Sequence, residues 1–135
     1  MQINKVTNHV SVSRQIQPED IKTLAEKGFK SIICNRPDGE DPDQPNFADI
    51  EAEAKKHGIQ AVYLPVISGK ITGEDTEKFK EKLGELPTPL LAYCRSGTRS
   101  ITLWSLAQAG YRNASEILKV TKAAGYDMSS VVQAL

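Results

Sequence analysis

The sequence predicts an α/β fold in which a central, mostly parallel sheet is flanked by helices. Two observations lead to this prediction. Short apolar segments rich in β-branched residues alternate with longer segments whose apolar residues recur at helical spacing. Glycine, proline and capping residues separate these segments. A chain of 135 residues can bury one core of this kind, so a single domain over residues 1–135 is expected.

The individual elements can be placed along the chain. Strands are expected at residues 10–12, 31–34, 61–66 and 89–93. Helices are expected at residues 18–27 and 47–57, from about residue 72, at residues 101–109, from residue 114, and after Asp127. Thr72 with Asp75, and Asn113 with Glu116, have the spacing of helix-capping pairs. Residues 35–46 are rich in proline and acidic residues and are expected to form a long loop at the rim of the site.

Composition narrows the classes of function. Seventeen basic residues balance seventeen acidic ones, and this gives no electrostatic footprint of a nucleic-acid partner. No signal peptide or membrane-spanning segment is visible, so a cytoplasmic protein without a membrane partner is expected. The two cysteines, sixty positions apart, match neither a metal-ligand spacing nor a disulfide framework. Neither a metal nor a cofactor is expected.

The segment that follows the last predicted strand has the features of an anion-binding loop. Cys94 lies between a buried strand and the first turn of a helix, where amide N–H groups and the helix dipole favour an anion. Arg95 and Arg99 add positive charge, so a reactive thiolate at neutral pH is expected. The other residues of this loop suit a tight turn or hydrogen bonding: Ser96, Gly97, Thr98 and Ser100.

A second segment ends at the same edge of the predicted sheet. Arg36 and Asp38 follow the strand at residues 31–34, and carboxyl ends of parallel strands are where such sheets bind ligands. Both residues are therefore candidate substrate contacts beside Cys94 and Arg99. Cys34 ends an apolar strand and is expected to be a small buried side chain.

Two family resemblances follow from these motifs. Residues 93–100 resemble the active-site loop of single-domain rhodaneses, in which four residues separate the cysteine from the arginine. Dual-specificity phosphatases have five residues in this gap. Residues 13–20, 33–40 and 63–66 are similar to a bacterial phosphatase-like domain that occurs alone or fused to β-lactamase-like persulfide dioxygenases. This resemblance implies a cysteine-phosphatase fold like that of the dual-specificity phosphatases, and a functional link to a persulfide dioxygenase.

The loop length favours sulfur transfer. One residue fewer shortens the loop by about 3.5 Å and removes one N–H donor, and the resemblance implies that the shorter loop suits a persulfide. Tyr93 stands where the phosphatase motif has a histidine. The loop directly after Val66 reads Ile67-Ser68-Gly69 and contains no aspartate. We therefore expect a sulfurtransferase that carries sulfane sulfur from thiosulfate, polysulfide or glutathione persulfide to a thiophilic acceptor through a Cys94 persulfide.

Two alternatives stay open. One is a phosphatase that acts on a small anionic substrate through a Cys94 phosphocysteine, with Asp38, Glu40 or Asp41 as acid if the loop at residues 35–46 folds over the cysteine. The other is an oxyanion-binding module without turnover.

Overall fold

The sheet and helices follow the predicted order, with one strand added at the N-terminus. The structure is a computed structural model that describes residues 1–135. The strands are β1 (Ile3–Lys5), β2 (Val10–Ser13), β3 (Ser31–Cys34), β4 (Gln60–Tyr63) and β5 (Leu90–Tyr93). The helices are α1 (Asp20–Glu26), α2 (Phe47–Lys56), α3 (Gly73–Glu85), α4 (Thr98–Ala107), α5 (Ala114–Ala123) and α6 (Ser129–Gln133).

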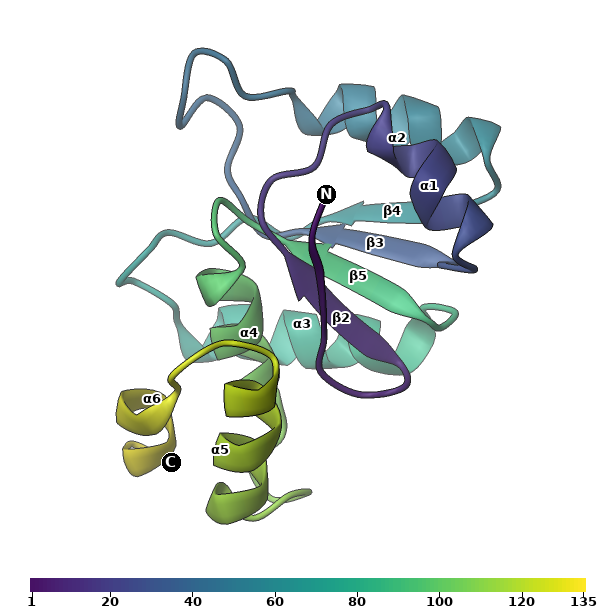
Figure 1. The fold of residues 1–135 in the computed structure, drawn as a ribbon. Helices are drawn as coiled ribbons and strands as arrows, with labels where there is room; N and C mark the ends of the chain where they lie inside the picture. The colour runs from purple at the N-terminus through teal and green to yellow at the C-terminus, as the bar shows by residue number, and fades with distance from the viewer.

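The five strands form one sheet in the order β1-β2-β5-β3-β4 (Figure 1). All neighbouring pairs are parallel except β1 with β2, which are antiparallel. The prediction of a mostly parallel sheet is therefore confirmed. Strand β5 lies at the centre, between β2 and β3, so the loop that follows it opens at the middle of the carboxyl edge.

Each face of the sheet is covered by its own apolar cluster. Figure 1 shows α1 and α2 on one side of the sheet, and α3 and α4 on the other. The α1–α2 side buries Ile16, Ile21 and Ile50 against the sheet. The opposite side buries Phe79, Ile101 and Trp104. Because side chains alternate between the two faces along a strand, neighbouring residues of β5 belong to different clusters.

Most helix boundaries agree with the capping signals. Thr72 and Asp75 form a complete capping box at the start of α3, and the Asn113 side chain accepts a hydrogen bond from the Glu116 amide at 2.8 Å. The Asp127 carboxylate accepts one from the Ser129 amide at 3.0 Å, at the start of α6. No helix combines the length and the apolar composition needed to cross a bilayer.

Two strands differ from the prediction. Strand β4 ends at Tyr63, three residues early, because Pro65 has no N–H to donate to the ladder. The amides of Leu64 and Val66 nevertheless donate to the carbonyls at the end of β3, at 2.9 and 3.0 Å. Strand β1 was not predicted, since its three residues contain one apolar side chain, Ile3. Pairing with β2 supplies the stabilisation that its sequence lacks.

Candidate active site

Cys94 lies directly after the central strand β5, and three residues separate it from the start of α4 at Thr98. Gly97, the N-cap of α4, has a left-handed φ of 94°, and its amide donates a hydrogen bond to Cys94 Sγ at 3.1 Å. A side chain at position 97 would also collide with Tyr126, whose hydroxyl lies 2.1 Å from the place of a Cβ atom. Glycine is therefore required here for backbone conformation and for space.

The loop around Cys94 presents amide donors that the protein does not use. The amides of Ser96, Arg99 and Ser100 make no hydrogen bond to any protein acceptor. The first N–H groups of a helix point out of its N-terminus, where the helix dipole adds positive potential. The start of α4 can therefore hold several oxygens of an anion beside the sulfur.

Arg99 is the arginine that lies inside the site. It is 8% exposed, and its Nη1 and Nη2 donate to the two carboxylate oxygens of Glu40 at 2.7 and 2.9 Å. Nη1 also donates to the Val66 carbonyl at 3.0 Å. A guanidinium has five N–H groups, so Nε–H and the second Nη2–H stay free. These two groups share one edge and can bind two oxygens of an oxyanion.

Ion pairs connect acidic side chains of the loop at residues 35–46 to two arginines, Arg36 and Arg99. The hydrogen bonds from Arg99, followed by those from Arg36, hold the pKa of Glu40 below its usual range. The pKa of Arg99 is raised, first by its hydrogen bond to Glu40 and also by its proximity to Cys94. Glu40 is therefore a carboxylate, and it fixes the direction of the Arg99 side chain.

Arg36 lies at the start of the same loop, and each of its three guanidinium nitrogens donates a hydrogen bond. It is 4% exposed, and it donates to Glu40 at 3.0 Å, to Gln15 at 3.1 Å and to Asp41 at 3.3 Å. In this arrangement Arg36 holds the loop over the site. A direct contact between Arg36 and substrate stays a prediction.

Asp38 and Asn35 hold the neighbouring backbone. The Asp38 carboxylate accepts from the Phe47 amide at 2.9 Å, at the start of α2, and the Asp38 amide donates to the Tyr63 hydroxyl. The Asn35 side-chain Oδ1 accepts from the Ser100 hydroxyl at 2.9 Å, and the side-chain Nδ2 donates to the Leu64 backbone carbonyl. Asn35 thus ties the end of β3 to the first turn of α4.

The loop hydroxyls do not contact the sulfur. Ser96 Oγ donates to Thr98 Oγ1 at 3.0 Å, and the Ser100 hydroxyl is used by Asn35. The donor to Cys94 is the Gly97 amide. Arg95 is exposed, and its side chain makes no hydrogen bond or ion pair within the protein. The substrate-binding roles expected for Arg95, Ser96, Thr98 and Ser100 stay predictions.

Tyr126 joins the site from a part of the chain that the sequence motifs do not indicate. Its hydroxyl donates to the Ser96 carbonyl at 3.0 Å and accepts from Asn4 at 3.1 Å. Burial raises the pKa of the Tyr126 hydroxyl. Thirty residues separate Tyr126 from Ser96, so no local pattern could have revealed this contact. A cavity of about 690 Å³ lies between α5 and α6, and no residue of the Cys94 loop lines it.

Cys34 and Tyr93 belong to the opposite face of the sheet. Both pack in the α1–α2 cluster, and the Cys34 thiol donates to the Arg36 carbonyl at 3.3 Å. Burial raises the pKa of Cys34 to about 11, and burial likewise raises the pKa of Tyr93. Cys34 is therefore a thiol, and it is a small buried side chain as the sequence predicts.

Comparison with known proteins identifies relatives across the whole chain. The family described as the phosphatase-like domain of β-lactamase hydrolase-like proteins matches residues 2–111. A β-lactamase hydrolase-like protein from Agrobacterium fabrum is 33% identical over 135 residues, or 98% of this chain. The chain spans 31% of the length of that relative.

Solved structures show the same fold. The crystal structure of a phosphatase candidate from Neisseria meningitidis Z2491 is 35% identical, with a TM-score of 0.89 over 99% of this chain and 96% of that one. The catalytic domain of the PP-IP phosphatase SIW14 from S. cerevisiae has a TM-score of 0.68 at 17% identity, over 98% of this chain and 89% of that one. The cysteine-phosphatase fold implied by the sequence is confirmed.

These matches contradict the expectation of a sulfurtransferase and favour the phosphatase alternative. Two arguments for sulfur transfer were wrong for physical reasons. Tyr93 lies on the opposite face from Cys94, so its identity says little about chemistry at the thiol. The missing aspartate after Val66 does not exclude a phosphatase, because an ester whose leaving oxygen needs little protonation can be cleaved without a protein acid. By sequence and by fold, the chain belongs to the phosphatase-like domain family of the β-lactamase hydrolase-like proteins.

Proposed function

We propose that this protein is a cysteine-dependent phosphatase that forms a phosphocysteine on Cys94. The observation that carries the proposal is the donor set around the sulfur. Cys94 Sγ accepts from the Gly97 amide, three further loop amides are unused, and the Nε edge of Arg99 is free. A phosphoryl group attached to sulfur presents three oxygens that need such donors.

In the first step the Cys94 thiolate attacks the phosphorus of a phosphate monoester. A sulfur–phosphorus bond forms, the bond from phosphorus to the ester oxygen breaks, and the alcohol or phenol leaves with the electron pair. The loop amides and the free edge of Arg99 stabilise the negative charge on the transferred oxygens. Glu40 holds that edge in place from the opposite side of the guanidinium.

The nearby carboxyl groups determine which leaving groups suit this site. Glu40 is held as a carboxylate by two arginines, and Asp38 is occupied at the start of α2. Neither is arranged to supply a proton to the leaving oxygen. General-acid help is typically worth roughly 10²–10⁴-fold. We therefore infer that the enzyme favours esters whose leaving oxygen needs little protonation, such as aryl phosphates.

In the second step water attacks the phosphocysteine. An oxygen–phosphorus bond forms, the sulfur–phosphorus bond breaks, the electron pair returns to Cys94, and the proton of the water passes to solvent. Inorganic phosphate leaves and the thiolate is restored. We further propose that the enzyme is cytoplasmic and acts on small anionic substrates, and the amide donors around Cys94 support the second part of this proposal.

The proposal is tested with a series of aryl and alkyl phosphates of graded leaving-group acidity. Wild-type protein should hydrolyse the aryl esters, and log kcat/KM should fall steeply as the leaving group becomes less acidic. A flat dependence would show that a protein acid is in place and would contradict this account of Glu40 and Asp38. Binding of inorganic phosphate without turnover of any ester would support the oxyanion-binding module.

A further inference from the structure

A small cavity lies beside the catalytic loop, and Ser96 of this loop is part of its lining. It has a volume of about 190 Å³ and is formed by the N-terminal strand, the end of β2, the loop after β5 and the turn between α5 and α6. Its polar lining comes from Gln2, Asn4, Arg14, Ser96 and Tyr126. The volume is below the roughly 300–1,000 Å³ of pockets for whole drug-sized ligands, so the cavity suits one small group.

The cavity is rich in donors and contains no acidic residue. Arg14 is exposed, and its guanidinium makes no hydrogen bond or ion pair within the protein. By contrast, Arg36, Arg99 and Arg112 each pair with a glutamate. The Asn4 side-chain amide donates one hydrogen to the Tyr126 hydroxyl, and its second N–H is free. An anion would meet five free N–H groups of Arg14 and no competing carboxylate.

The register of the sheet places this cavity next to Cys94. The Cα atoms of Ser13 and Tyr93 are partners in the β2–β5 ladder, and the Cys94 amide donates to the Ser13 carbonyl at 3.4 Å. Arg14 therefore follows one strand while Cys94 follows its neighbour, and adjacent strands lie about 4.8 Å apart. Ser96 lines the cavity and belongs to the catalytic loop. Cys94 itself does not line the cavity, so Ser96 is the residue through which the loop and the cavity meet.

We propose that the cavity at Arg14 is a second anion-binding subsite, which selects substrates that carry another phosphate or similar anionic group close to the scissile phosphate. This inference rests on the proposed phosphatase function and names its substrate class. Arg14 binds the second anion, and Asn4 adds a neutral donor. Tyr126 lines the cavity, and its hydroxyl donates to the Ser96 carbonyl of the catalytic loop at 3.0 Å.

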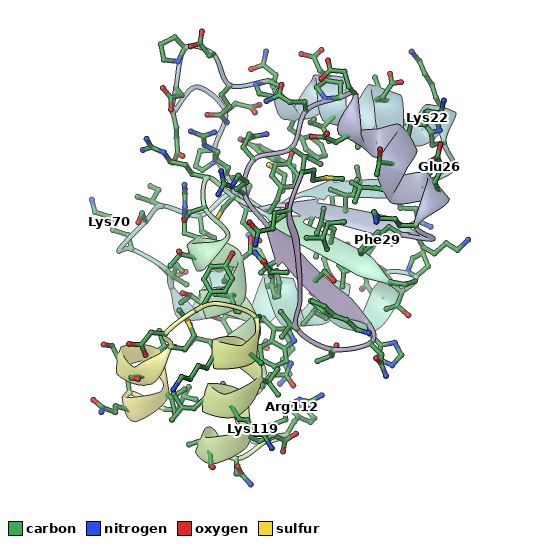
Figure 2. All side chains as sticks on the ribbon, viewed as in Figure 1. Lys22, Glu26, Phe29, Lys70, Arg112 and Lys119 are labelled. Atoms are coloured by element: carbon green, nitrogen blue, oxygen red, sulfur yellow. The ribbon has the colours of Figure 1, made fainter.

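The test uses the monophosphates and bisphosphates of catechol, resorcinol and hydroquinone, which hold two phosphates at three fixed spacings on similar leaving groups. For the full chain, kcat/KM should be at least about tenfold higher for one bisphosphate than for its monophosphate, after correction for the two equivalent esters. Arg14→Gln should reduce this ratio to about threefold or less. Arg112→Gln is the matched control, since it removes the same charge near α5 (Figure 2), outside this cavity, and should leave the ratio unchanged.

The variant Arg95→Gln distinguishes specific binding of an anion at Arg14 from a general attraction of anions by positive charge near Cys94. Arg95 is exposed beside Cys94 but does not line the cavity, so its loss should lower kcat/KM for both esters by similar factors. If Arg95→Gln and Arg14→Gln reduce the ratio equally, or if neither reduces it, the subsite does not exist although the phosphatase proposal stands.

Calorimetric binding to Cys94→Ser protein keeps the subsite testable if no ester is hydrolysed. The preferred bisphosphate should bind about tenfold more tightly than its monophosphate, and Arg14→Gln should abolish the difference. Absence of hydrolysis together with this binding pattern would overturn the phosphatase function and keep the subsite. Equal affinities would overturn the subsite.

Discussion

The two cysteines of this protein lie at the carboxyl ends of neighbouring parallel strands, and they are equally hidden from solvent. Cys94 is 1% exposed and Cys34 is 2% exposed. Their hydrogen-bond partners differ in kind. Cys94 Sγ receives the Gly97 amide, whereas the Cys34 thiol gives its proton to the Arg36 carbonyl. Cys94 Sγ therefore acts as a hydrogen-bond acceptor and the Cys34 thiol acts as a donor.

This difference shows that burial alone does not decide whether a cysteine is reactive. Cys34 lies among apolar side chains of the α1–α2 cluster, where burial raises its pKa to about 11. Cys94 lies on the other face, at the start of a ten-residue helix with unused amides and beside Arg99. The same sheet edge thus holds a buried thiol and the proposed nucleophile about one strand apart.

The largest expected effect separates the two cysteines by function. Cys94→Ser should reduce aryl-phosphate turnover by several orders of magnitude, because it removes the nucleophile. Cys34→Ser should leave kcat within about threefold and lower the free energy of unfolding by about 1 kcal/mol, because a hydroxyl replaces sulfur in an apolar cluster. Steady-state kinetics and urea unfolding measure the two quantities. Equal losses of activity in the two variants would contradict the comparison.

Removal of the Arg99 guanidinium should have the next largest effect. Arg99→Ala should lower kcat by roughly 10²–10³-fold, because the transferred oxygens lose a bidentate donor in the transition state. Arg99→Lys should recover little of this loss, since an ammonium cannot bind Glu40 and an oxyanion through two separate edges. Arg36→Lys is an informative comparison because Arg36 contacts the same Glu40. A loss in kcat from Arg36→Lys as large as that from Arg99→Lys would show that charge near Glu40, and not the geometry of Arg99, is what matters.

A smaller effect is expected when the carboxylate behind Arg99 is neutralised. Glu40→Gln should lower kcat about tenfold, because Arg99 loses the partner that orients its free edge. The glutamine keeps the size of the side chain but cannot accept at both terminal atoms. An increase in kcat would show that Glu40 competes with substrate for Arg99, contrary to this account.

The pH dependence of stability provides an independent check on Glu40. Its pKa in the folded protein is lowered, so its ion pairs contribute stability above its unfolded pKa, and this contribution is lost as pH falls through the folded pKa. The difference in free energy of unfolding between wild type and Glu40→Gln should be constant from pH 7 to 5. It should shrink below about pH 4. A difference that is already shrinking at pH 6 would contradict the assigned charge state.

Much of the scaffold could be predicted from sequence, because local patterns determine it. The apolar run before Cys34 and the loop residue Gly97 both have local signatures, and both lie where the sequence places them. Strand β1 could not be predicted, since it depends on pairing with β2. The ion pair of Arg99 with Glu40 joins residues 59 positions apart. The sequence indicates only that a carboxyl group of the loop at residues 35–46 could act as an acid if this loop folds over Cys94, and it does not indicate the ion pair.

The reaction type was harder to predict than the position of the nucleophile. The spacing from Cys94 to Arg99 indicates the length of the loop. It does not indicate the direction of the Arg99 side chain or its ion-pair partner, Glu40. Tyr93 was read as evidence on chemistry, although strand alternation directs its side chain into the α1–α2 cluster. Tyr126 was missed altogether, because its contact with Ser96 depends on how α5 and α6 return to the loop.

The central claim is a covalent phosphoryl intermediate on one of two buried cysteines, and mass spectrometry of acid-quenched protein tests it most directly. After rapid mixing with an aryl phosphate, wild-type protein should gain one phosphoryl group, about 80 mass units, on the peptide that contains Cys94. The peptide that contains Cys34 should stay unmodified. Burst release of the phenol should match the amount of this adduct. Rapid turnover of the ester with no adduct on Cys94, or with an adduct on Cys34, would contradict the account.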